Sequence, residues 1–357
     1  MLNQETNEII PFDSNQWEIK AEESKLEDYL GKKSLFLKGG FAIIKDSNFT
    51  DGILEYDVAF ENERGFLGGV WRLQDDGNYE EFYIRSHQSG NPDANQYSPH
   101  FNHISSWALY YGEGYAVPME YSYNEWIHVK IIVSGKDGEV YIEDMENPAL
   151  VIKELKRDIK AGKVGLHVLG FTPGHFANFT YQSISNPPLK ISKKPESTPE
   201  GTITSWLVSN NFSAEYLENK FTLAEDEEQE FDWTELETES NGLANLSRVQ
   251  GIEDGKNSVF AKVKINSDRD VVKKLKFGFS ARVKVYFNGN IFYAGNNVYG
   301  SRDYRFLGTL GLFDELYLPL KKGENELWMA VSMEDKIRAG WGLIGQFDDF
   351  QGISSSQ

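Results

Sequence analysis

The sequence predicts an all-β protein made of two β-sandwich domains in tandem. Three observations support this fold class. Apolar and polar residues alternate with a period of two along most of the chain, the pattern of strands that bury one face. Turn-forming Asp, Asn and Gly residues separate these short stretches, and helical periodicity is weak throughout. The chain has 357 residues, a length that favours two domains over one.

The first half of the chain, residues 1–185, contains the clearest strand patterns. From Leu54 to Glu61, four apolar side chains interleave with acidic or small ones, which predicts a strand with a carboxylate-rich outer face. The predicted strands Val70–Leu73 and Phe82–His87 flank an Asp-Asp-Gly-Asn turn, so we expect a hairpin. The further strands predicted in this half are Trp126–Val133, Glu139–Glu143, Lys163–Leu169 and Phe176–Ile184.

Residues 186–200 have the composition of a linker, because the short stretch Asn186–Gly201 holds four of the eleven prolines. The all-β texture returns in residues 201–357, and short strands separated by turn signals are typical of jelly rolls. The acidic run Glu225–Glu230 predicts a solvated loop. The strands predicted in this half are Ser258–Ile265, Lys274–Phe279, Arg282–Phe287, Glu315–Leu320 and Glu326–Val331.

Composition excludes several classes of function. The net charge of −19 argues against nucleic acid, since phosphate binding depends on clustered Lys and Arg. The absence of cysteine excludes disulfides and thiolate metal sites. No apolar run is long enough for membrane insertion. The first eleven residues lack a signal-peptide pattern, so the compartment stays open: cytoplasmic, or secreted or periplasmic if a leader has been removed.

Residues 1–185 resemble the concanavalin A-like lectin/glucanase superfamily, in particular its laminin-G-like and 3-keto-disaccharide hydrolase-like branches. The stretch Phe49–Phe60 resembles that family's early long strand, and Gly68–Arg85 resembles its paired strands around an Asp-Asp-Gly-Asn turn. Asn124–Asp144 and Ala161–Leu166 resemble its closing hairpins. The resemblance implies a sandwich with one concave sheet whose outer face holds saccharide.

Residues 201–357 resemble the galactose-binding-like jelly rolls that accompany catalytic domains in many glycoside hydrolases. The stretches that carry this resemblance are Thr202–Phe212, Ala281–Gly295, Leu318–Val331 and Gly340–Phe347. Such modules bind sugar or brace a neighbouring domain, so the resemblance implies an accessory role.

Candidate ligand-binding residues lie on one predicted strand and in the segment that follows it. Alternation places Glu81, Tyr83, Arg85 and His87 on one face, where a ring for stacking and polar groups for hydroxyls suit a sugar. Residues 91–114 form a long aromatic segment, and such segments in compact domains are usually functional. Its candidates are His100, His103, Trp107, Tyr110 and Tyr111. A solvated sheet face, plain loop packing and a histidine metal site stay open as alternatives.

The candidate catalytic residues are Glu55, Asp57 and Glu61. The resemblance to retaining β-glucanases implies two glutamates on one strand, four or five residues apart. Here the second glutamate follows the first by six residues, which spans roughly 20 Å in a strand. A retaining mechanism needs carboxyl groups about 5–5.5 Å apart, so the spacing disfavours catalysis and favours a solvated acidic strand face.

The sequence as a whole favours binding of a saccharide or polysaccharide by the first domain, with the second as accessory module. A glycan-cleaving enzyme using the same groove is the alternative, and a structural or adhesion module is another. No nucleophile elbow or phosphate loop is present. We expect no cofactor, and a structural calcium ion stays open because carboxylates are abundant.

Overall fold

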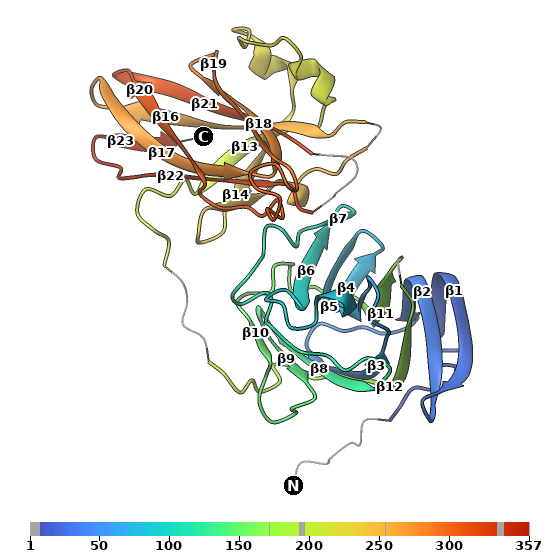
Figure 1. Cartoon of the computed structure of the whole chain (residues 1–357). Helices are drawn as coiled ribbons and strands as arrows, with labels where there is room; N and C mark the ends of the chain where they lie inside the picture. Colours follow the sequence, from blue (N-terminus) through green and yellow to red (C-terminus); the bar gives the residue numbers. More distant parts are fainter. Residues whose placement is uncertain (1–7, 171, 193–196, 254, 334–338, 357) are drawn as a thin grey trace. The chain divides into compact units, whose positions relative to one another are not determined.

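The computed structural model describes residues 8–170, 172–192, 197–253, 255–333 and 339–356 (Figure 1). The chain divides into two compact units. Unit 1 comprises Met1–His100 and Tyr110–Lys193, and unit 2 comprises Phe101–Leu109 and Lys194–Gln357. The helices of the described residues are short 3₁₀ turns, η1 (Ser86–Gln88), η2 (Ala214–Leu217), η3 (Glu227–Glu230) and η4 (Leu246–Arg248). The prediction of an all-β fold is confirmed.

Unit 1 contains one large antiparallel sheet with the strand order β10-β9-β8-β3-β12-β2-β11-β4-β5-β6, and β1 pairs with β2. The strands are β1 (Trp17–Tyr29), β2 (Lys32–Ile44), β3 (Gly52–Ala59), β4 (Phe66–Asp75), β5 (Asn78–Arg85), β6 (Asn95–Phe101), β8 (Ile127–Ser134), β9 (Asp137–Ile142), β10 (Leu150–Ile152), β11 (Lys163–Leu169) and β12 (Gly174–Ser183). β1 and β2 form the long hairpin drawn in blue in Figure 1.

The sheet of unit 1 folds back on itself around a core. Leu54, Tyr56 and Val58 of β3 are fully buried, as the period-two pattern predicts. A Cβ atom on Gly69 of β4 would lie 3.0 Å from the Tyr56 ring and 3.3 Å from Ile131 of β8. These strands are not neighbours in the sheet, so two parts of the sheet face each other, as in a sandwich.

A charged network is enclosed in this core. Arg72, 1% exposed, lies in an irregular part of β4 and adopts a left-handed backbone with φ of 48°. Its guanidinium donates to Glu80 at 3.2 Å, to Asp51 at 3.0 Å, and to the carbonyls of Thr50 and Gly135 at 2.7 Å. Glu80 also accepts from Trp and Tyr side chains, so this buried carboxylate is fully paired.

Unit 2 is a sandwich of two antiparallel sheets, with strand orders β14-β13-β16-β21-β18-β19 and β15-β22-β17-β20, and β23 pairs with β16. Trp206 and Trp341 are fully buried in the core cluster between them. The strands are β13 (Ser205–Ser209), β14 (Trp233–Glu237), β15 (Leu243–Asn245), β16 (Ser258–Ser267), β17 (Val271–Phe279), β18 (Ala281–Phe287), β19 (Asn290–Asn297), β20 (Asp314–Leu320), β21 (Gly323–Ser332), β22 (Gly342–Phe347) and β23 (Ile353–Ser356).

Two segments differ from what the sequence predicts. The acidic run does not form a wholly solvated loop, because η3 buries Glu227, which accepts from Tyr216, Lys220 and the Ala224 amide. The middle of the long aromatic segment, with the short strand β7 (Ile104–Ser105), belongs to unit 2. No helix among the described residues has the length and apolar character to cross a membrane.

Candidate functional site

The residues predicted on the strand before the aromatic segment lie on β5, but they are enclosed. Glu81, Tyr83 and Arg85 are 4–6% exposed. Arg85 donates to the Asp93 carbonyl at 2.8 Å and to the Tyr83 hydroxyl at 3.2 Å, so its donors serve the protein itself. β5 ends at Arg85, and half-buried His87 lies in η1 beyond it. The partly exposed stacking face expected here is therefore not present.

Glu81 joins a cluster that includes one histidine from the predicted set and one that the sequence did not single out. Its carboxylate oxygens accept from His100 at 2.7 Å and from His167 of β11 at 2.8 Å. Burial would raise the pKa of Glu81, but the charges and hydrogen bonds of the two histidines outweigh it and lower that pKa to about 2. Phe41 stacks on His167 and Tyr79 stacks on His100, which encloses the cluster.

The other candidates of the aromatic segment are divided between the units. His103, exposed, and Trp107, half-buried, belong to unit 2. Tyr110, buried, and Tyr111, half-buried, belong to unit 1. Trp107 and Tyr83 are thus parts of different compact units. Among the described residues, no group of three or more His, Asp or Glu side chains is arranged to hold a metal ion.

The candidate catalytic strand carries a second charged cluster, on the outer side of β3. Asp57, 5% exposed, accepts from three side chains: Lys32 Nζ at 2.6 Å, Asn178 Nδ2 at 2.6 Å and His128 Nδ1 at 2.7 Å. These donors come from β2, β12 and β8, so one carboxylate joins three strands. Burial opposes the charged form, but the bonds from His128, Lys32 and Asn178 outweigh it and lower the pKa of Asp57.

His128 lies between the two carboxylates of β3. Its Nδ1 donates to Asp57, and its Nε2 donates to Glu55 at 3.2 Å. Hydrogen bonds to Asp57 and Glu55 raise the pKa of His128 to about 9, so the ring is an imidazolium at neutral pH. Glu61, the third candidate, lies beyond the end of β3 at Ala59 and is exposed.

Local irregularities of the chain place two of the three donors. β12 shifts register against β3 between Ala177 and Thr180, and Asn178 in this bulge has φ of 52°. Asparagine tolerates this left-handed region, and bulges commonly re-aim a side chain. Lys32 follows a tight turn in which Leu30 and Gly31 both have positive φ, as a two-residue hairpin requires.

Aromatic rings surround the tip of this hairpin. Tyr29 stacks on His175 with ring centres 3.6 Å apart and meets Trp126 edge-on. Lys32 Nζ lies 5.0 Å from the centre of the Trp126 ring, and the indole nitrogen donates to the Leu30 carbonyl at 3.1 Å. These contacts hold the hairpin tip against β8 and β12 and so restrict where Lys32 can reach.

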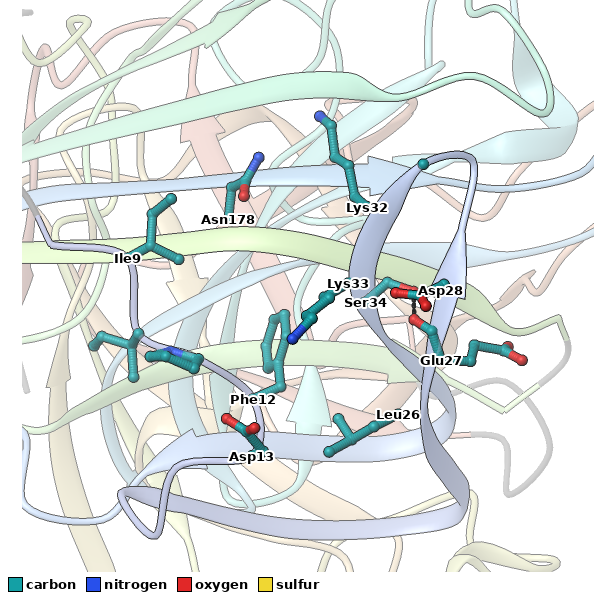
Figure 2. A pocket seen from close by; sticks show the side chains of 13 residues that line it. Ile9, Phe12, Asp13, Leu26, Glu27, Asp28, Lys32, Lys33, Ser34 and Asn178 are labelled. Atoms are coloured by element: carbon teal, nitrogen blue, oxygen red, sulfur yellow. Dashed lines mark hydrogen bonds between the residues drawn. The ribbon is translucent and has the colours of Figure 1, made fainter.

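A pocket of about 760 Å³ lies between this hairpin and the N-terminal segment (Figure 2). Its apolar lining comes from Ile9, Ile10, Pro11, Phe12 and Leu26. Its polar lining comes from Asp13, Glu27, Asp28, Lys32, Lys33, Ser34 and Asn178. In Figure 2, Phe12 and Lys33 extend into the space between the two segments, and Lys32 and Asn178 lie near its edge.

The pocket and the Asp57 cluster are directly connected, because Lys32 and Asn178 belong to both. Of the residues predicted from sequence, the site contains Glu55 and Asp57 only. Lys32, His128 and Asn178 were missed, because 25, 71 and 121 positions separate them from Asp57. Phe12 and the hairpin carry no local sequence signal for a site.

Comparison with known proteins gives distant likenesses. No family model matches the chain, and no curated protein matches it. The carbohydrate-binding module CBM66 from Bacillus subtilis is 16% identical, with a TM-score of 0.37, over 48% of this chain and 98% of that one. A β-glucanase from Bacillus licheniformis is 11% identical, with a TM-score of 0.36, over 50% of this chain and 98% of the enzyme. A protein of unknown function with a galectin-like fold, from Bacillus subtilis, is 10% identical, with a TM-score of 0.32, over 50% of this chain and 95% of that protein.

Proposed function

We propose that unit 1 binds a neutral saccharide, without cleaving it, in the pocket between its N-terminal segment and the β1–β2 hairpin. The observation that carries the proposal is the composition of this pocket. An apolar wall with Phe12 lies opposite a few polar groups held in place, which is how small-molecule sites combine affinity with orientation. A sugar ring presents a C–H face to such a wall and hydroxyls to the polar groups.

The state of Asp57, the candidate catalytic residue bonded to the pocket edge, favours binding over cleavage. Glycoside hydrolysis needs one carboxyl group that holds a proton and a second that acts on the other side of the scissile bond. Asp57 accepts three hydrogen bonds and has a lowered pKa, so it is unsuited to donate a proton. Both nitrogens of His128 are bonded to carboxylates, which leaves no free lone pair for a base.

The role of unit 2 follows from the same proposal. We propose that unit 1 is a concanavalin A-like lectin domain and that unit 2, a galactose-binding-like jelly roll, is its accessory module. Residues 186–200 would then join two independently folding domains.

Phe12→Ala is expected to weaken saccharide binding about 10-fold to 100-fold, because burial of a Phe side chain contributes roughly 1.5–3 kcal/mol. A glycan array with the full chain identifies the best neutral oligosaccharide, and isothermal titration then compares the variants. Leu169→Ala is the matched control, since Leu169 is an exposed apolar residue of unit 1 outside the pocket. Equal affinities for Phe12→Ala and the wild type would rule out this pocket. Release of reducing ends from the bound glycan would show that the protein cleaves the saccharide, and would overturn the proposal of binding without cleavage.

A further inference from the structure

The orientation of the side chains at the edge of the pocket depends on a residue that does not line the pocket. Lys32 and Asn178 lie on different strands, and the buried carboxylate of Asp57 accepts a hydrogen bond from each of them. Lys32 Nζ and Asn178 Nδ2 each lie 2.6 Å from the same oxygen, Oδ2, while Oδ1 accepts from His128. Asp57 does not line the pocket itself, so its effect on a ligand must pass through these two side chains.

The pairing also determines the charge that a ligand meets. Asp57 neutralises Lys32, and His128 is held between Asp57 and Glu55. Lys33 forms no ion pair among the described residues, and the other ionisable groups of the lining are the carboxylates Asp13, Glu27 and Asp28. Glu27 is paired with His175 and Lys25. Within the part of the chain that the structure describes, the lining charges without an ion pair are therefore Lys33, Asp13 and Asp28, a balance that offers an anion no net attraction.

We propose that Asp57 is the specificity-determining positioning residue of the pocket, with His128 as its support, and that together they select neutral saccharides over uronates. Asp57 holds Lys32 and Asn178 as hydrogen-bond donors for hydroxyl oxygens, and it neutralises the positive charge of Lys32 that a ligand carboxylate would otherwise meet. The inference deepens the proposed function and rests on it. Without Asp57, Lys32 becomes an unpaired cation at the edge of the pocket.

The charged groups around His128 support a dependence on pH. The His128 ring faces Asp57 and Glu55 of β3. The backbone N–H of His128 donates to the carboxylate of Glu143, which follows β9, and Lys130 lies two residues further along β8. Lys32 of β2 lies across the shared Asp57. Because the pKa of His128 is raised to about 9, the imidazolium persists through neutral pH and is lost as pH rises through about 9. Neutral-glycan binding is then expected to weaken above that pH.

The test uses an array of neutral and uronate-containing oligosaccharides with the full-length wild type, Asp57→Asn, Lys32→Gln and the double variant. The wild type is expected to bind neutral glycans alone. The affinity of Asp57→Asn for neutral glycans is expected to fall about tenfold, and this variant is expected to gain binding to uronates. Adding Lys32→Gln to Asp57→Asn is expected to abolish that gain. Unchanged preference in Asp57→Asn, or uronate binding by the wild type, overturns the inference.

A measurement without ligand separates failure of the positioning from failure of the proposed function. The chain has six histidines, so ¹³C-labelled His spectra can follow His128 through a pH titration. The wild type is expected to titrate near pH 9 and Asp57→Asn markedly lower, with the other histidine signals showing that the variant is folded. Titration of wild-type His128 at the ordinary histidine pKa of 6.5 overturns the positioning role of Asp57. Titration of His128 near pH 9 together with no binding to any glycan overturns the saccharide proposal instead.

Discussion

Arg72→Met is expected to lower the free energy of unfolding of unit 1 by about 3–5 kcal/mol, because it leaves the buried carboxylate of Glu80 without its charged partner. Glu80 is completely buried, and Asp51 would lose its bond from the guanidinium. Hydrogen exchange of the slowest amides in β4 and β5 of the full chain measures the loss. The control is Arg64→Met, an exposed arginine for which a change within about 0.5 kcal/mol is expected. Equal protection in both variants would show that the buried network contributes nothing.

Trp341→Ala is expected to destabilise unit 2 by about 3–5 kcal/mol, the range for truncating a buried aromatic side chain. Trp341 is fully buried in the core, and its indole nitrogen donates to the Val331 carbonyl at 3.2 Å. Exchange of the slowest amides in β16 and β21 reports the change. Tyr304→Ala is the control, because Tyr304 is 80% exposed. An equally stable variant with altered glycan binding would instead make Trp341 a ligand-contacting residue.

The strands that could be predicted from the sequence are those with one buried face and one solvated face. Leu54, Tyr56 and Val58 show this, since each is buried as the alternation indicates. β1 was not predicted, because it is largely exposed and its sequence is charged on both faces. The start of β5 was also missed, since the charged Glu80 interrupts the apolar pattern. Glu80 is buried because Arg72, Trp71 and Tyr97 donate to its carboxylate, and these contacts form only in the folded sheet.

The candidate site could be predicted only in part. Period two places Glu55 and Asp57 on one outer face, and the structure confirms that both reach His128. The sequence could not indicate that Asp57 is paired with Lys32 and Asn178, because these contacts depend on strand order and on a bulge in β12. Glu81 and Arg85 were correctly placed on one strand, but the partners that enclose them come from other strands and loops.

Hydrogen exchange of the full chain with and without the neutral glycan selected on the array tests the central claim most directly. Binding in the proposed pocket is expected to slow exchange in residues 9–13 and 26–34, the N-terminal segment and the β1–β2 hairpin tip that line it. Protection confined to residues 81–87, to the aromatic segment 91–114 or to unit 2, with these two segments unchanged, would contradict the account.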